Sequence, residues 1–161
     1  YTGAAGTRLY FVDCYIDGTT DFIFGPSTAL FEDCIIHSKR NSYVTAASTP
    51  KEAKYGYVFK HCKLTAEPGV DKVYLGRPWR PYAYTLFIEC ELGKHIVLAG
   101  WHNWGKQSNE ETARYMEYKN TGEGANASER VAWSKQLTKK EAEAVTVDAI
   151  FRTQSDWNPI D

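Results

Sequence analysis

The chain has 161 residues, of which 43% are hydrophobic and 14% aromatic, a composition that excludes an intrinsically disordered segment. Its 19 basic and 20 acidic side chains give a formal net charge of -1, so charge offers no basis for a nucleic acid or an anionic membrane as partner. The sequence contains no apolar run long enough to span a bilayer.

A repeat of the form Phe-x-polar-Cys-x-Ile/Leu occurs four times and contains every cysteine of the chain. Its copies are residues 11–16, 31–36, 59–64 and 87–92. The cysteines are 20, 28 and 28 residues apart, about the length of one coil in a parallel solenoid. Strand alternation would point each Cys, and the Ile or Leu two positions later, into the core. The repeat therefore predicts an all-β fold, a right-handed parallel β-helix.

We expect the four cysteines to stack as free thiols, because equivalent positions of one repeat suit small buried apolar residues. Two disulfides are the alternative for an exported protein with an even cysteine count. Within a single strand, alternation would place the Phe of each repeat on the opposite face from its Cys. The repeat then requires either a bulge or a separate packing site for the Phe.

A second apolar stretch follows each repeat, and we expect it to form the next strand of the same coil. The stretches are residues 21–25, 43–46, 73–75 and 96–99. Asp21 lies in residues 18–25, where apolar and polar residues alternate between two glycines, which predicts a short strand that holds this carboxylate rigidly. Arg77 would lie about two coils away, roughly 10 Å along the stack, a distance that a guanidinium side chain can largely span.

Beyond Gly100 the sequence contains no further copy of the Phe-x-polar-Cys repeat. Residues 138–141 match a capping box and precede good helix formers, so we expect a short helix over about 139–145. This helix would be a packing cap over the end of the solenoid. We expect one domain, with coils over about 1–100 and C-terminal loops and the capping helix over about 101–161.

Two pentapeptides stand out in this order: Asp-Phe-Ile-Phe-Gly at 21–25 and Leu-Gly-Arg-Pro-Trp at 75–79. Further along are Gly-Trp at 100–101, Glu-Tyr-x-Asn-x-Gly-x-Gly-Ala at 117–125 and Arg-Val-x-Trp at 130–133. With these motifs the chain resembles the C-terminal portion of the pectin methylesterases, or pectinesterases, nearly from end to end.

The resemblance implies an enzyme that hydrolyses the C6 methyl esters of polygalacturonate and releases methanol. Asp21 would be the nucleophile that forms an acyl-enzyme anhydride. A carboxylate in apolar surroundings needs a cationic partner to stay ionised, and Arg77 would provide it and orient one oxygen toward the ester. The sequence contains no Gly-x-Ser-x-Gly, so a serine hydrolase is unsupported.

Substrate-binding residues also follow from the resemblance. Trp79 would form part of the wall against which a sugar ring packs, and Phe24 and Trp104 would share that task, although a core position for Phe24 is equally open. Thr20, beside the nucleophile, is a weaker candidate. The four histidines are not in metal-ligand spacing, so we expect no metal or cofactor and treat them as surface or packing residues.

One catalytic element of the family is absent. Its second Asp, the general acid/base, lies in a Gln-Asp-Thr-Leu motif just before the strand that matches residues 9–11, and this sequence lacks that motif. We therefore expect the chain to be the C-terminal portion of a larger enzyme, with the missing N-terminal coils as its partner. Alone, it should have weak or no activity.

Two other interpretations remain. The chain could belong to another pectin-active β-helix enzyme, a glycosidase or lyase, although no clustered acidic pair marks a glycosidase. It could also be a non-catalytic pectin-binding module. All three interpretations share methyl-esterified pectin as partner and imply a secreted, periplasmic or cell-wall location.

Overall fold

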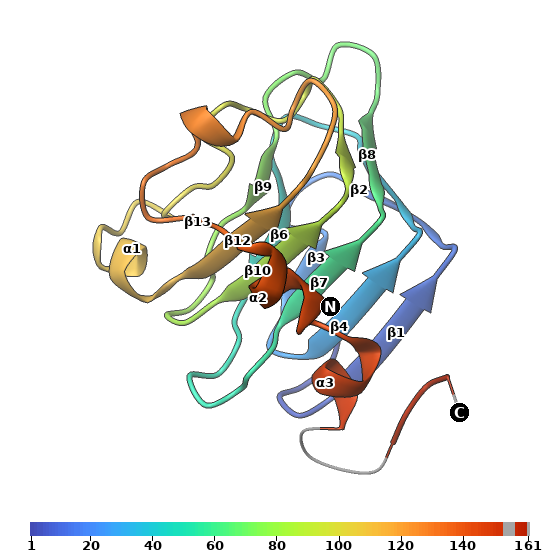
Figure 1. The fold of residues 1–161 in the computed structure, drawn as a ribbon. Coiled ribbons are helices and arrows are strands. Elements are labelled where there is room, and N and C mark those ends of the chain that lie inside the picture. Colours follow the sequence, from blue (N-terminus) through green and yellow to red (C-terminus); the bar gives the residue numbers. More distant parts are fainter. Residues whose placement is uncertain (153–156, 161) are drawn as a thin grey trace.

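The computed structural model describes residues 1–152 and 157–160, which wind through three parallel sheets (Figure 1). Sheet A consists, in spatial order, of β1 (Arg8–Val12), β4 (Thr28–Glu32), β7 (Tyr57–Lys60), β10 (Tyr84–Ile88), β12 (Arg114–Tyr118) and β13 (Lys135–Gln136). Sheet B consists of β2 (Tyr15–Gly18), β5 (Ile35–Ser38), β8 (Lys63–Ala66) and β11 (Glu91–Leu92). Sheet C consists of β3 (Ile23–Gly25), β6 (Tyr43–Ala47) and β9 (Tyr74–Gly76). Each of the first three coils passes through all three sheets in turn, which confirms the expected parallel β-helix.

The phenylalanines of the repeat form a ladder inside the solenoid. Phe11 pairs with Phe31, Phe31 with Phe59, and Phe59 with Phe87 in the strand register of sheet A. Their rings stack with centroids 4.8, 4.5 and 4.4 Å apart and are nearly parallel. The last three rings are fully buried. This ladder forms the centre of the core.

Each repeat bends between its Phe and its Cys, so the two do not share a strand, and the Phe has a separate packing site, one of the two possibilities that the sequence left open. The residue before each Cys has a left-handed backbone, with φ of 53° at Asp13, 54° at Asp33, 52° at His61 and 49° at Glu89. Such a residue turns the chain sharply. The Phe therefore points inward from sheet A, and the Ile or Leu after the Cys points inward from sheet B.

The cysteines lie at this corner and are free, as predicted. Cys34, Cys62 and Cys90 are buried, whereas Cys14 in the first coil is partly exposed. Each buried sulfur contacts the carbonyl oxygen of the Phe one coil earlier: Cys34 with Phe11 at 3.5 Å, Cys62 with Phe31 at 3.4 Å and Cys90 with Phe59 at 3.6 Å.

Three of the four second stretches form strands, namely β3, β6 and β9. The expected strand over 96–99 was wrong. Only isolated bridges extend sheet C there, from Val73 to Ile96 and from Gly76 to Trp101. Turn hydrogen bonds between residues three apart, such as Gly100 N–H to Val97 O at 3.0 Å, curl the chain between them.

Sheet A continues beyond Gly100, because β12 pairs in parallel with β10 and β13 pairs with β12. Short helical segments flank β12 in the sequence: α1 (Ser108–Thr112) before it and the 3₁₀ turn Ala127–Glu129 after it. A buried Arg130–Glu117 ion pair, with Nε to Oε2 at 2.8 Å, fastens the returning chain to β12.

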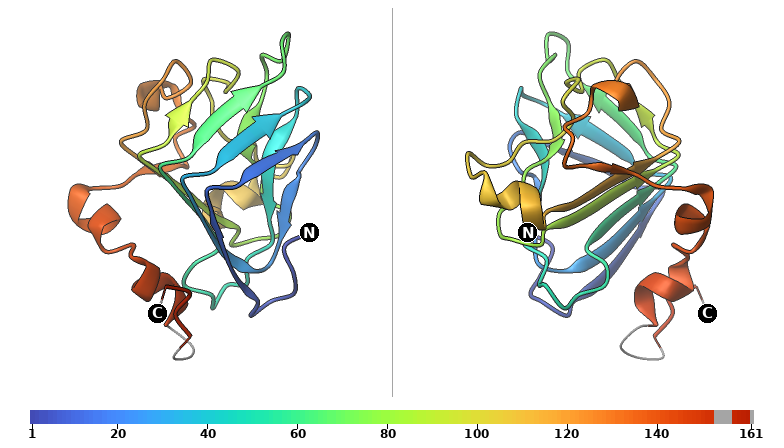
Figure 2. Two further views of the ribbon diagram at one scale, coloured as in Figure 1. Left: turned by 90° about the vertical axis from the view of Figure 1, so that its right-hand side faces the viewer. Right: turned by 60° about the vertical axis from the view of Figure 1, so that its left-hand side comes forward.

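The helix predicted from the capping box is α2 (Lys139–Glu143), and both reciprocal bonds of the box are present. A further helix, α3 (Val147–Phe151), follows it. Both lie against the outer face of sheet A, beside the coils and not over their end (Figures 1 and 2). That face carries an apolar row of Leu30, Val58 and Leu86, which forms one buried cluster with Val145 after α2 and with Ile150 and Phe151 of α3. No helix within the described ranges is long and apolar enough to cross a membrane.

Candidate active site

Asp21 lies just before β3, at the edge of sheet C. Its backbone is left-handed, with φ of 48°, so it occupies a bend and not the strand that alternation predicted. Its N–H donates to Tyr43 O at 2.9 Å, which fixes it to the next coil. A Cβ at Gly18 would lie 2.2 Å from Phe22 Cβ, so only glycine fits where the chain folds back before the nucleophile candidate.

Arg77 follows β9, two strands away across sheet C, as the sequence predicted. Its Nε donates to Asp21 Oδ1 at 3.0 Å and its terminal nitrogen donates to Oδ2 at 2.7 Å. The pair is largely buried, with side-chain exposures of 20% and 18%. A bidentate, charge-assisted contact of this kind holds the carboxylate in one orientation.

Two aromatic rings enclose the guanidinium. Its central carbon lies 3.9 Å from the centroid of the Tyr43 ring and 3.8 Å from that of Trp104. Cation–π contacts on both faces leave the planar group little freedom to rotate. Burial alone would lower the pKa of Arg77, but hydrogen bonding and attraction to Asp21 outweigh it, and the net direction is upward. Arg77 is therefore a permanent cation beside Asp21.

An open groove of about 280 Å³ passes over the Asp21 carboxylate. Its lining residues are Thr20, Asp21, Phe24, Ala46, Trp79 and Trp104. The groove thus brings together every substrate-binding candidate from the sequence. Phe24 and Trp79 meet edge to face at 5.9 Å, and both rings are partly exposed, so Phe24 is not confined to the core. Aromatic walls beside a carboxylate suit a ring with one apolar face and a reactive substituent.

Sequence reasoning missed three residues of this region. Tyr43 begins β6 and covers Arg77, and Ala46 is a small residue that keeps the groove open. His102, treated as a surface or packing residue, lies edge-on to the Tyr43 ring at 5.4 Å and accepts a hydrogen bond from the Trp104 N–H. The sequence signal for Tyr43 was its place at the start of the expected strand 43–46, between the stretches that carry Asp21 and precede Arg77.

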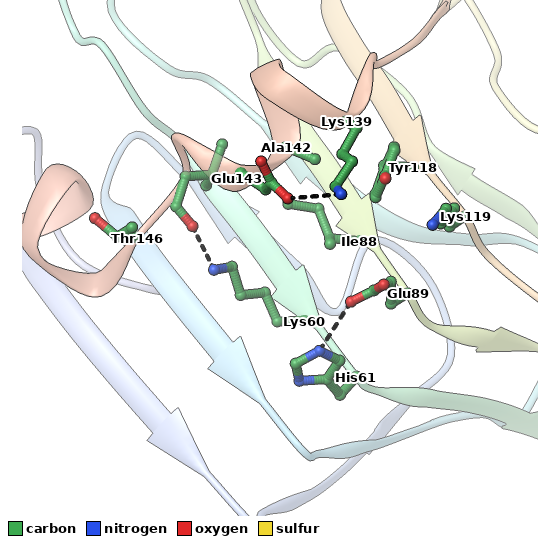
Figure 3. Close-up of a pocket in the computed structure, with 11 residues that line it drawn as sticks. Lys60, His61, Ile88, Glu89, Tyr118, Lys119, Lys139, Ala142, Glu143 and Thr146 are labelled. Carbon is green, nitrogen blue, oxygen red and sulfur yellow. Dashed lines mark hydrogen bonds and ion pairs between the residues drawn. The ribbon is translucent and has the colours of Figure 1, made fainter.

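A second hollow, of about 310 Å³, lies between α2 and the C-terminal ends of β7, β10 and β12 (Figure 3). It shares no lining residue with the groove. Its charged groups pair with one another, His61 with Glu89 at 3.2 Å and Lys139 with Glu143 at 3.6 Å. The Lys60 ammonium donates to a backbone carbonyl after α2. Among residues 1–152 and 157–160, no group of three or more His, Cys, Asp or Glu is placed to hold a metal ion.

A family model described as Pectinesterase matches residues 2–154. The chain belongs to the pectinesterase family. Pectinesterase 31 of Arabidopsis thaliana is 44% identical over 136 residues, which are 84% of this chain and 43% of that protein. Putative pectinesterase 11 of the same plant is 40% identical over 92% of this chain and 42% of its own length. The chain therefore spans less than half the length of these pectinesterases.

Solved pectin methylesterases share the fold. The enzyme from carrot superimposes with a TM-score of 0.85 at 34% identity, covering 91% of this chain and 50% of that one. A pectin methylesterase in complex with a hexasaccharide superimposes with a TM-score of 0.78 at 27% identity, covering 98% of this chain and 55% of that one. These matches confirm the right-handed β-helix that the repeat predicted.

Proposed function

We propose that this chain supplies the nucleophile and its arginine to a pectin methylesterase, which hydrolyses C6 methyl esters of polygalacturonate to methanol and free carboxylates. The observation that carries the proposal is the bidentate Asp21–Arg77 pair at the floor of an aromatic groove. Membership of the pectinesterase family and the likeness to solved pectin methylesterases support the same reaction.

In the proposed reaction, a carboxylate oxygen of Asp21 attacks the C6 carbonyl carbon of the ester. The tetrahedral intermediate expels the methoxy group, which leaves as methanol after taking a proton from a general acid. The remaining acyl group is joined to Asp21 as an anhydride. The conjugate base of that general acid then takes a proton from a water molecule, which attacks the uronyl carbonyl of the anhydride. This step gives the free uronic acid, regenerates the Asp21 carboxylate and restores the general acid. Arg77 keeps Asp21 ionised and aimed throughout.

Coils that precede Tyr1 would supply the general acid and the oxyanion donors. The terminal strands of sheets A, B and C are β1, β2 and β3, whose outer edges can accept another coil. Side chains of this first coil are less buried than their counterparts in the next: Phe11 is partly exposed, whereas Phe31 is fully buried. An added coil would cover Phe11 and lie directly beside Asp21.

Methyl-esterified homogalacturonan is the proposed substrate. The groove presents Phe24, Trp79 and Trp104, whose rings suit the apolar faces of successive sugar residues. A solved relative bound to a hexasaccharide supports an oligosaccharide in this groove. Because such a polymer lies outside cells, we place the full protein in a secreted, periplasmic or cell-wall location.

The test compares this chain alone with the extended protein, meaning this chain joined to the segment that precedes Tyr1 in the full protein. We expect methanol release from highly methylated pectin by the extended protein and little or none from the chain alone. A fall in viscosity without methanol would indicate a glycosidase or lyase instead. Binding without either product would indicate a pectin-binding module.

A further inference from the structure

Trp104 has a left-handed backbone, with φ of 61°, which is unusual for a bulky residue and needs local support. Two consecutive hydrogen bonds from the backbone to side chains supply that support. The Trp104 N–H donates to His102 Nδ1 at 3.0 Å, and the Gly105 N–H donates to Asn103 Oδ1 at 2.8 Å. Each acceptor lies two residues before its donor, so the turn depends on both side chains.

His102 is itself fixed against the strand that presents Arg77. Its N–H donates to Gly76 O at 3.1 Å. Its ring lies edge-on to the rings of Tyr43 at 5.4 Å and Tyr74 at 5.3 Å, and these two rings stack on each other at 5.2 Å. The imidazole is therefore held by two neighbouring strands, with Nδ1 left to face the turn.

We infer that His102 is a positioning residue: its Nδ1 accepts the Trp104 N–H and so keeps the indole on the Arg77 guanidinium. The effect on catalysis rests on the proposed function, whereas the placement of Trp104 does not. With Tyr43 on its other face, Arg77 is confined to the plane in which its fork binds Asp21. Loosening Trp104 would free Arg77 and remove one wall of the groove.

The hydrogen bond requires a neutral imidazole with its proton on Nε2, because only an unprotonated Nδ1 can accept. The charged and titratable groups around His102 are Arg77 after β9, Tyr43 in β6, Tyr74 in β9 and Glu110 in α1. Glu110 and His102 both line a separate hollow of about 190 Å³. Burial, and then the charge of Arg77, lower the pKa of His102. Protonation of Nδ1 would place its N–H in repulsive contact with the Trp104 N–H. It would also add a second cation beside Arg77.

The tautomer can be read directly by ¹⁵N NMR of the extended protein with labelled histidine, the His102 signals being assigned by their loss in His102→Asn. We expect a proton on Nε2 and none on Nδ1 near neutral pH. A proton on Nδ1 would overturn the inference. This measurement decides the placement even if the protein releases no methanol, in which case the proposed function fails separately.

Kinetics of two variants test the consequence for catalysis. His102→Phe keeps a ring but removes the acceptor, and we expect kcat/KM to fall about tenfold, with part of the loss in KM.

His102→Asn offers Oδ1 to the same N–H, as Asn103 does for Gly105. It should retain kcat/KM to within about threefold of the unaltered protein and should lose the fall at acid pH that His102 protonation causes. Unaltered kinetics in His102→Phe, or equal losses in both variants, would contradict the inference. His61→Asn is the control, because His61 is exposed and asparagine tolerates its left-handed backbone.

Discussion

Asp21 and Arg77 are 56 residues apart in the sequence, yet two hydrogen bonds of 3.0 and 2.7 Å join them. The contact spans two steps of sheet C, from the bend before β3 to the residue after β9. The stacking of the coils brings the two side chains within reach of each other. The rings of Tyr43 and Trp104 then fix the plane of the guanidinium.

Replacing Arg77 should reduce methanol release by the extended protein. Arg77→Gln leaves a largely buried carboxylate without its cation, and we expect kcat/KM to fall roughly 100-fold. Arg77→Lys should recover only part of this loss, because an ammonium cannot bind both oxygens or stack between two rings. The exposed Arg40→Gln is the control and should match the unaltered protein. Full activity in Arg77→Gln would show that the pair is structural only.

The Glu117–Arg130 pair should contribute strongly to stability. Its side chains are 4% and 3% exposed, and Arg130 also donates to the carbonyls of Val97, Leu98 and Gly124. Glu117→Gln leaves this buried cation uncompensated, so we expect the free energy of unfolding to fall by about 3 kcal/mol in urea titrations.

The matched control for that change is Glu91→Gln. Glu91 pairs with Lys63 at 3.2 Å, but both side chains are more than half exposed. Exposed pairs contribute little, so the change in unfolding free energy should stay within about 0.5 kcal/mol. Equal effects of the two substitutions would refute the role assigned to Glu117.

His95 should make the protein less stable in acid. It is 4% exposed, and burial followed by the charge of His37 lowers its pKa to about 4. The unfolded chain, with an ordinary value near 6.5, binds this proton first, so stability falls as pH drops from about 6.5 to about 4. The full contribution is about 3 kcal/mol. His95→Gln should flatten this part of the stability profile. An unchanged slope in His95→Gln would contradict the assignment.

Thiol chemistry should distinguish Cys14 in the first coil from Cys34 and Cys90 in later coils. Cys14 is partly exposed and should react with a thiol reagent in the folded protein. Burial raises the pKa of Cys34 to about 12 and that of Cys90 well above its usual range, so these thiols should react only after unfolding. Counting the reactive thiols before and after denaturation, with no reductant present, checks this prediction. Fewer than four thiols in the unfolded chain would reveal a disulfide.

The parts of the structure that follow from repetition were predictable. Equivalent positions in successive coils stack, so the Phe-x-polar-Cys repeat predicted the parallel coils and their free cysteines, and the offset between Asp21 and Arg77 predicted their contact. The Phe ladder was not predicted, because the repeat did not show where the Phe rings pack. The sharp turns between sheets A and B could not be predicted from the repeat length. Their left-handed position is occupied by Asp13 and Asp33 but also by His61 and Glu89, so no single residue type marks it. Asp and His are residue types that favour this conformation, whereas Glu is not.

The residues around Arg77 show a second limit. Trp104 was predictable from its motif, but the His102 contact depends on a left-handed residue in an irregular turn, which leaves no periodic signature. The placement of α2 was also missed, since the capping box fixes where a helix begins and not what it covers. The apolar outer face of sheet A, which packs with Leu137 before α2 and Val145 after it, decides that instead.

The most direct test of the proposed reaction is methanol release from highly methylated pectin by the extended protein and by its Asp21→Asn variant. An amide of the same shape keeps the groove but cannot act as a carboxylate nucleophile. We predict that the extended protein releases methanol and that Asp21→Asn, folded to the same extent, releases none above background. Equal release by both proteins, or by neither, would contradict the assignment of Asp21 as the nucleophile of a pectin methylesterase.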